Sequence, residues 1–166
     1  MPGTYNIQQN SQGHVKDNDG QIIDGLCVWC YRITYDPGAP PPDTAALEGD
    51  WRFEGLDKVL DPSGPELTDP DVDSKTVPDY QLDGKKVVFS QPKIHPDATD
   101  KKQPPPNGFG NVTWIDLCFV VKCGAVGTRM ISVWRKKPNR DKFEPVKALK
   151  DHDASNENEK KLQGPK

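Results

Sequence analysis

The chain has 166 residues, of which 33% are apolar and 28% charged, and it contains 14 glycines and 17 prolines. Prolines at this frequency would break long helices, so the composition excludes a coiled coil or a helical bundle. No apolar run approaches the roughly 20 residues that cross a bilayer as a helix, which excludes a helical membrane protein. Four Trp, four Tyr and five Phe are more aromatic surface than a disordered chain usually carries. We therefore expect a folded domain rich in strands and loops.

Two segments show the period-two alternation of β-strands. In residues 21–35, one face is entirely apolar and aromatic, formed by Cys27, Trp29, Tyr31, Ile33 and Tyr35. Residues 112–123 alternate in the same way, with Ile115, Leu117, Phe119 and Val121 on one face. After a turn at residues 124–127, the chain returns as the apolar segment 129–135. This length and turn chemistry predict that 112–123 and 129–135 form a hairpin.

Shorter elements complete the predicted fold. Residues 80–89 predict a second hairpin, turning at Asp83-Gly84, a pair preferred in type I′ turns. His14-Val15 and Ile22-Ile23 are expected to be the arms of a third. Weaker patterns predict strands at 4–7 and 51–53. Helix is expected only as a turn or two at residues 43–48 and 143–150.

The loops and the C-terminus have a distinct composition. Residues 36–108 contain thirteen of the 17 prolines, which predicts a long proline-rich loop region that includes the hairpin at 80–89. Residues 151–166 hold only Ala154 and Leu162 as apolar residues, which predicts a disordered polar C-terminal tail. The expected organisation is a single β-domain over residues 1–150. Its fold class is all-β, an antiparallel β-sandwich or jelly-roll-like barrel with little helix.

Charge is distributed unevenly along the chain. Residues 36–84 contain thirteen acids and three bases, a net charge of −10, and residues 85–166 contain seventeen bases and nine acids, a net charge of +8. Folding can neutralise the two segments within one molecule, and docking between copies of the chain can do the same. Solvation of both surfaces is the third alternative, and the sequence does not choose among them.

The four cysteines are Cys27, Cys30, Cys118 and Cys123. A closed Cys₄ zinc site would need tight turns between ligands, whereas these cysteines lie within the two strongest predicted strands. Spacings of three and five place the members of each pair on opposite faces of a strand. The first residues have no basic or apolar signal-peptide region, so we expect cytoplasmic synthesis with no signal peptide. Buried thiols are then the favoured interpretation, and a cross-strand disulfide would need an oxidising compartment.

A second candidate metal site is the run Asp69, Asp71 and Asp73. Alternating acids begin a calcium loop, but the sixth and twelfth positions hold Ser74 and Tyr80 instead of glycine and a bidentate acid. A turn is the favoured interpretation, with an irregular calcium site as the alternative. We predict no metal and no cofactor.

The sequence contains no recognisable catalytic constellation. The three histidines (His14, His95 and His152) lie in unrelated contexts. Asp116 is the one acid inside a strong strand, and we expect it to pair with Arg129 or Lys122 across the sheet. We therefore predict no catalytic residues and no enzymatic activity.

Two weaker patterns concern binding. A basic stretch with interleaved aromatics is typical of nucleic-acid contacts, and it comprises Trp134, Arg135, Lys136, Lys137, Arg140, Lys142 and Phe143. Acidic residues follow it and no nucleic-acid motif accompanies it, so nucleic acid is not the expected partner. Trp51 between Asp50 and Arg52 is compatible with sugar binding.

The expected function is that of a non-enzymatic structural or accessory subunit of a macromolecular assembly, of the virion or extracellular-fibre type. Such a subunit would contact copies of itself or other subunits through its loops and tail, and its final location would be the virion or the extracellular assembly. The alternative is a ligand-binding module with carbohydrate as the first candidate ligand. A small β-fold enzyme ranks third.

Overall fold

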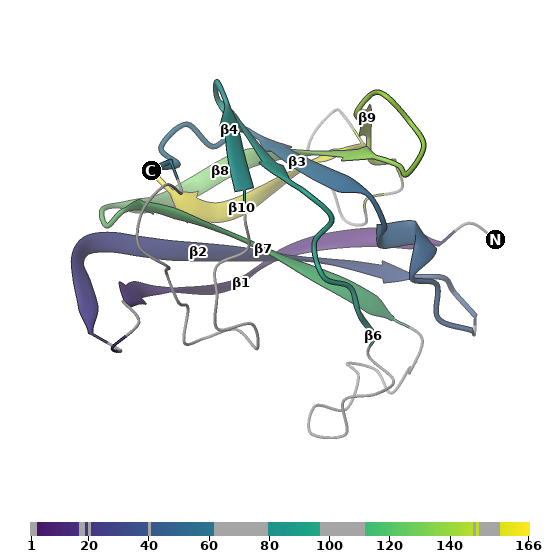
Figure 1. Ribbon diagram of the computed structural model, residues 1–166, viewed down its shortest axis with the longest axis horizontal. Helices are drawn as coiled ribbons and strands as arrows, with labels where there is room; N and C mark the ends of the chain where they lie inside the picture. The colour runs from purple at the N-terminus through teal and green to yellow at the C-terminus, as the bar shows by residue number, and fades with distance from the viewer. Residues whose placement is uncertain are drawn as a thin grey trace.

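The computed structural model describes residues 3–16, 19, 21–39, 41–61, 80–96, 112–147, 149 and 157–166. Its strands form two antiparallel sheets that lie one above the other (Figure 1). This arrangement confirms the predicted all-β sandwich.

The first sheet has the strand order β1-β2-β7-β6. Its members are β1 (Thr4–Lys16), β2 (Ile22–Asp36), β7 (Thr113–Lys122) and β6 (His95–Pro96). β1 and β2 form the predicted N-terminal hairpin, which pairs from Thr4 with Asp36 to Lys16 with Ile22. β2 and β7 pair over ten consecutive positions, from Leu26 with Lys122 to Tyr35 with Thr113. This central ladder is the most regular part of the fold.

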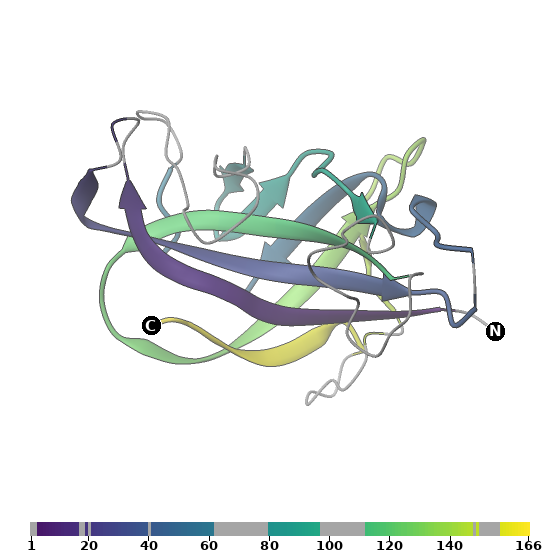
Figure 2. The same ribbon diagram turned by 90° about the horizontal axis from the view of Figure 1, so that it is seen from below.

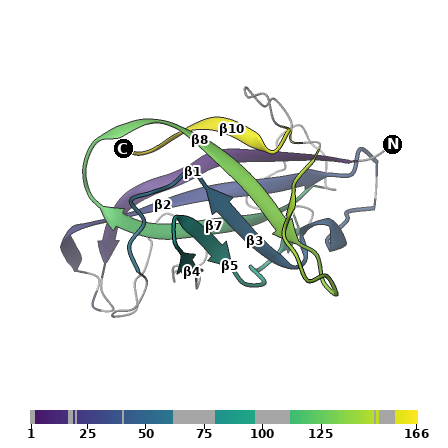
Figure 3. The same cartoon turned by 90° about the horizontal axis from the view of Figure 1, so that it is seen from above.

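The second sheet has the order β10-β8-β3-β5-β4 (Figure 3). β9 also pairs with β8. Its strands are β3 (Asp50–Glu54), β4 (Tyr80–Asp83), β5 (Lys86–Phe89), β8 (Val126–Lys136), β9 (Glu144–Pro145) and β10 (Glu159–Pro165). A single 3₁₀ turn, η1 (Ala45–Leu47), precedes β3. The predicted hairpin at 80–89 is present as β4 and β5. Asp83 pairs with Lys86, so the turn residues are Gly84 and Lys85, one position later than predicted.

The core lies between the sheets and follows the predicted alternation. Trp29, Tyr31 and Ile33 of β2 are buried there with alternate residues of β7, the set Ile115, Leu117, Phe119 and Val121. The second sheet contributes Trp51 and Phe53 from β3. Rings from the two sheets meet edge-on, with the centroids of Tyr31 and Phe53 5.8 Å apart. The period-two pattern therefore identified the buried face of both long strands correctly.

The prediction that β7 and β8 form a hairpin is wrong. β7 pairs with β2 and β6 in the first sheet, and β8 pairs with β3, β10 and β9 in the second. The connection therefore crosses from one sheet to the other. Since β7 and β8 both have an apolar face, crossing lets the two faces pack against each other across the core, which pairing side by side would not do.

The prediction of a disordered tail is wrong for the last residues of the chain. β10 pairs with β8 from Glu159 with Ser132 to Pro165 with Val126, and it runs beside β1 of the other sheet (Figure 2). Lys160 Nζ donates hydrogen bonds to Asn6 Oδ1 and the Ile7 carbonyl, and the Tyr31 hydroxyl donates to the Gln163 carbonyl. An edge strand has only one neighbour and one buried face, so a polar composition suffices for it.

The helix predictions are met in part. Residues 43–48 contain η1, as expected for a single turn. The segment 143–150 contains β9 instead of helix, and the Val146 N–H donates to the Val133 carbonyl of β8. Backbone pairing with an existing strand satisfies these groups without a helix.

Candidate functional site

The candidate site is an open cavity at the end of the sandwich where β3 begins and β8 ends, which we call the loop-end cavity. Its volume is about 430 Å³. Three segments line it: residues 48–50, the post-β5 residues Gln91, Pro92 and Ile94, and residues 136–140. Loops at the end of a sandwich commonly carry the binding residues of such folds.

Unusual backbone conformations shape this cavity. Gln91 and Asn139, with φ of 44° and 67°, are the two non-glycine residues of positive φ in the described part of the chain, and both line it. Gly49 has a φ of 105°, and a Cβ there would collide with the Lys136 carbonyl oxygen. The Gln91 N–H donates to Asp50 Oδ1 at 3.1 Å, which fixes the turn after β5. Strained backbone held in place by its surroundings concentrates at functional sites.

The cavity wall carries charges of both signs. Asp50 Oδ2 lies 3.4 Å from Lys136 Nζ across the β3–β8 ladder. Lys137 and Arg140 are exposed, and the backbone N–H of Arg140 donates to the Lys137 carbonyl at 3.1 Å. Glu48, also exposed, lies on the same wall. The cavity therefore presents charged side chains of both signs on a backbone held by hydrogen bonds.

A second cavity adjoins the first. Its volume is about 540 Å³, and it is lined by Tyr5, Arg135, Lys137 and residues 144–147. Lys137 lines both cavities, and we call the linings of the two together the loop-end surface.

Two residues suggested for ligand binding instead hold the backbone beneath this surface. Arg135 donates from Nε to the Glu48 carbonyl and from Nη2 to the Ala45 carbonyl, at 2.8 and 2.7 Å. The Trp51 ring is fully buried, and its Nε1–H donates to the Leu47 carbonyl at 2.9 Å. These bonds attach η1 to the second sheet. Arg135 is thus occupied by backbone carbonyls, and Trp51 is not a platform for a sugar ring.

The aromatic residues of the basic stretch, Trp134 and Phe143, are in contact with a side chain of this protein. The Arg52 guanidinium lies 4.8 Å from the ring centroid of Trp134 and 4.7 Å from that of Phe143, and it is paired with Glu54 at 2.9 Å. Cation–π contacts of this kind stabilise the outer face of the sheet. The basic stretch does, however, supply Lys136, Lys137 and Arg140 to the loop-end cavity.

The interpretation of the cysteines as buried thiols is wrong, because all four are paired in disulfides. Cys27 is bonded to Cys123 and Cys30 to Cys118, with Cα–Cα distances of 5.0 and 4.1 Å. The two bonds lie on opposite faces of the first sheet, as the spacing predicted. Disulfides are typical of proteins in non-reducing compartments, whereas the cytosol keeps thiols reduced. The pairing also rules out a shared Cys₄ zinc site in this state.

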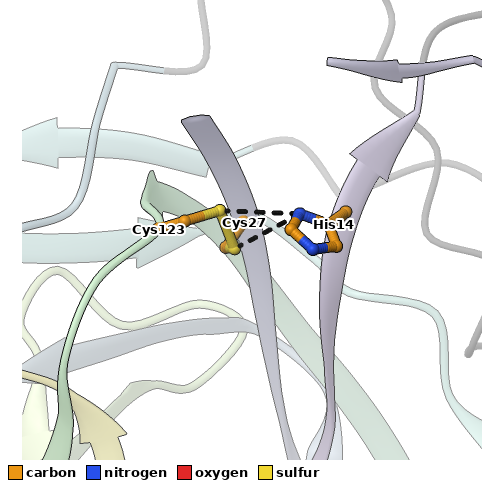
Figure 4. A group of neighbouring side chains, drawn as sticks. All are labelled: His14, Cys27 and Cys123. Atoms are coloured by element: carbon orange, nitrogen blue, oxygen red, sulfur yellow. Dashed lines mark hydrogen bonds between the residues drawn. A yellow bond between two sulfur atoms is a disulfide. The ribbon is translucent and has the colours of Figure 1, made fainter. Parts of the chain in front are cut away.

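Beside one of the disulfides lies a histidine. His14 Nδ1 is 3.9 Å from Cys27 Sγ and 3.8 Å from Cys123 Sγ (Figure 4). β1 places His14 directly opposite Cys27 in the ladder with β2. This contact could not be read from the sequence, because it depends on the register of a hairpin that contains two irregularities.

The remaining candidates either lie outside the described residues or are paired within the first sheet. Asp69, Asp71 and Asp73 lie outside the described residues, as does His152. The ring of His95 stacks on Trp114 with centroids 5.5 Å apart. Asp116 pairs with Arg32, its partner in the β2–β7 ladder, through two hydrogen bonds of 2.8 and 3.0 Å. The prediction of Arg129 or Lys122 as its partner is wrong, since Arg129 lies on β8 of the other sheet and Lys122 lies at the end of the same strand as Asp116.

Comparisons with known proteins add no relative. No protein-family description, no curated protein and no solved structure matches this chain. Among the described residues, no helix has the length and apolar character needed to span a bilayer.

Proposed function

We propose that the protein is a non-enzymatic structural or accessory subunit of a macromolecular assembly, of the virion or extracellular-fibre type. In this proposal, the loop-end surface binds a neighbouring subunit, either a copy of the chain or another component. The observation that carries the proposal is the pair of adjoining cavities that share Lys137.

The chemistry of this surface suits a protein partner. Five of the eleven residues that line the loop-end cavity are charged: Glu48, Asp50, Lys136, Lys137 and Arg140. Small-molecule pockets are mostly apolar and surround their ligand, whereas charges of both signs on an open surface set orientation and specificity between proteins. The fixed backbone beneath lowers the entropic cost of docking.

Some of the charges that could bind a neighbouring subunit are already paired within the molecule. Among the described residues, two ion pairs join the acidic segment to the basic one: Asp50 with Lys136 at 3.4 Å and Asp57 with Arg129 at 2.8 Å. Folding therefore neutralises part of the opposite charge of residues 36–84 and 85–166 within one molecule. The exposed charges of Lys137 and Arg140 remain on the loop-end surface, where an acidic partner would meet them.

The two disulfides support an extracellular or virion location for the proposed subunit, because such settings maintain disulfides. Trp51, the residue suggested for carbohydrate binding, is buried in the core and cannot contact a sugar there.

The proposal is tested by sedimentation velocity over a range of protein concentrations at low and high salt. We expect association that weakens toward 1 M salt, where the Debye length falls to about 3 Å. The double variant Lys137→Glu/Arg140→Glu should weaken association further. Its control, Lys85→Glu/Lys122→Glu, makes the same change in net charge at exposed bases outside both cavities.

A protein that stays monomeric under every condition would contradict assembly through copies of itself. If a defined glycan then bound on an array, and binding were lost in the Lys137→Glu/Arg140→Glu variant, the ligand-binding module would replace the proposed function.

A further inference from the structure

The Cys27–Cys123 disulfide differs from its neighbour in accessibility. Cys30 and Cys118 are fully buried among Val15, Val28 and Val120 on the outer face of the first sheet. Cys123 is partly exposed, one residue beyond the end of β7, and the adjoining His14 is exposed. A solvent-borne thiol therefore reaches Cys27–Cys123 more readily than Cys30–Cys118, and exchange rates depend on such access.

The fold does not need the accessible bond to keep its strands joined. Cys30–Cys118 links β2 to β7 within their ten-position ladder, and Cys27–Cys123 links β2 to the residue that follows β7. The Cys123 N–H also donates to the Gly25 carbonyl at 2.9 Å, which anchors Cys123 by its backbone. After opening of Cys27–Cys123, the two sulfurs and the imidazole would remain side by side.

These three groups have the spacing of metal ligands. His14 Nδ1 and both sulfurs lie within 4.8 Å of one another, and Figure 4 shows the imidazole facing the disulfide. Tetrahedral zinc with bonds of about 2.3 Å to sulfur and 2.0 Å to nitrogen holds its sulfur and nitrogen ligands roughly 3.6 Å apart. The nitrogen–sulfur distances of 3.8 and 3.9 Å are close to that value. Only the two sulfurs must separate, by side-chain rotation.

We propose that reduction of Cys27–Cys123 unmasks a Cys₂His site for Zn²⁺, formed by Cys27, Cys123 and His14. Reduction breaks the sulfur–sulfur bond with two electrons and two protons, which a dithiol supplies while it becomes a cyclic disulfide. Zn²⁺ then binds the two thiolates and neutral Nδ1, and the two thiol protons are released to solvent. A water molecule completes the tetrahedron. The site goes beyond the proposed assembly function and does not depend on it.

The choice of zinc follows from the donor set. Two thiolates and one imidazole suit zinc, whereas calcium and magnesium take oxygen ligands. The oxidised protein lacks thiolates, so the site is closed in a non-reducing compartment and opens only where thiol reductants are present. The disulfide would thus act as a redox-controlled gate on metal binding.

The test begins with mild reduction by dithiothreitol and removal of the reductant without air. Alkylation and mass spectrometry should find Cys27 and Cys123 free and Cys30–Cys118 intact. Zn²⁺ is then titrated against a chromophoric chelator. We expect one Zn²⁺ per reduced chain and at least a 100-fold weaker affinity in the oxidised protein. Co²⁺ as a spectroscopic probe should show the visible absorption of a tetrahedral thiolate site.

Three variants locate the site. His14→Ala should weaken Zn²⁺ binding by at least tenfold, and Cys27→Ser/Cys123→Ser should abolish it. Cys30→Ala/Cys118→Ala keeps the three ligands and, after the same mild reduction, should bind Zn²⁺ as the reduced parent protein does. Equal binding by the oxidised protein or by His14→Ala would overturn the proposal. So would loss of the β-sheet circular dichroism on mild reduction, because the site needs the folded β1–β2 register.

Discussion

The two disulfides allow a quantitative test of how they stabilise the fold. They connect the same two segments of the chain, residues 27–30 and 118–123, with sequence separations of 96 for Cys27–Cys123 and 88 for Cys30–Cys118. In the chain-entropy model, either bond alone restricts the unfolded chain by closing one long loop, a contribution of about 4.6 kcal/mol. Once one bond is present, the other closes only a ring of about ten residues, a contribution of about 2.6 kcal/mol in the same model.

Replacement of the cysteines by alanine should therefore be non-additive. Removing either disulfide should lower the free energy of unfolding by about 2.6 kcal/mol, and removing both by about 7 kcal/mol, which exceeds the sum of the two by about 2 kcal/mol. Lost packing around the buried Cys30 and Cys118 contributes equally to the single and double removals, so it cancels in a double-mutant cycle.

The assay is urea unfolding of the parent, the two variants that each lack one disulfide and the variant that lacks both, monitored by circular dichroism. All four are measured in the same concentration of a stabilising osmolyte, so that the variant without disulfides remains folded. Additivity within about 0.5 kcal/mol would refute the reasoning, because independent sites behave in that way. It would mean that loop closure in the unfolded chain is not what these bonds provide.

Three further outcomes follow from the fold. Trp29→Ala should cost about 3–5 kcal/mol, as large core truncations do, because Trp29 is only 2% exposed; a chemical denaturation midpoint little changed from that of the parent would contradict this. Deleting residues 157–166 removes β10 and should lower the thermal midpoint sharply, whereas an unchanged midpoint would show that β10 is dispensable. Burial raises the pKa of Tyr31 and of Tyr80 above 10, so the unfolded state loses these protons first. The contribution of these two tyrosines to stability should be constant up to about pH 10 and fall above it, and Tyr31→Phe should remove up to about 1.4 kcal/mol per pH unit of that fall; equal alkaline slopes in the two proteins would be evidence against it.

Local sequence patterns were enough to predict those features that depend on a single strand or a single turn. The alternation around Trp29 and around Leu117 identified the buried faces of β2 and β7 because each face must be apolar to pack against the other sheet. The β4–β5 hairpin could be predicted because glycine at position 84 supplies the positive φ, 61°, that the turn uses.

Non-local pairing could not be predicted in the same way. The connection between β7 and β8 is compatible with a hairpin or with a crossing between sheets. The outcome depends on the pairing of β7 with β2 and of β8 with β3, which are distant in the sequence. β10 has few apolar residues because a single edge strand buries little, so its composition resembles that of a disordered segment. The oxidation state of the cysteines depends on the compartment, which no local pattern encodes.

The loop-end cavity itself was not predicted, although the sequence analysis had named several of the residues that line it. Lys136, Lys137 and Arg140 were recognised as a basic stretch and Asp50 as a candidate sugar contact, but their shared location depends on β3 and β8 being neighbours. Gln91 carries no sequence signal for its positive φ, since glutamine rarely adopts that conformation.

The two proposed sites lie at opposite ends of the sandwich, and this separation makes them independent. β8 begins at Val126, three residues after Cys123, and ends at Lys136 in the loop-end cavity. Its eleven residues span about 33 Å at the usual rise of a strand. The Cys27–Cys123 bond belongs to the first sheet, so opening it breaks no backbone pair between β8 and its neighbours. Reduction with zinc binding should therefore leave association unchanged, and Lys137→Glu/Arg140→Glu should leave zinc binding unchanged. If reduction dissolved the assembly, Cys27–Cys123 would have to lie at the contact between subunits, and the loop-end surface would lose its assigned role.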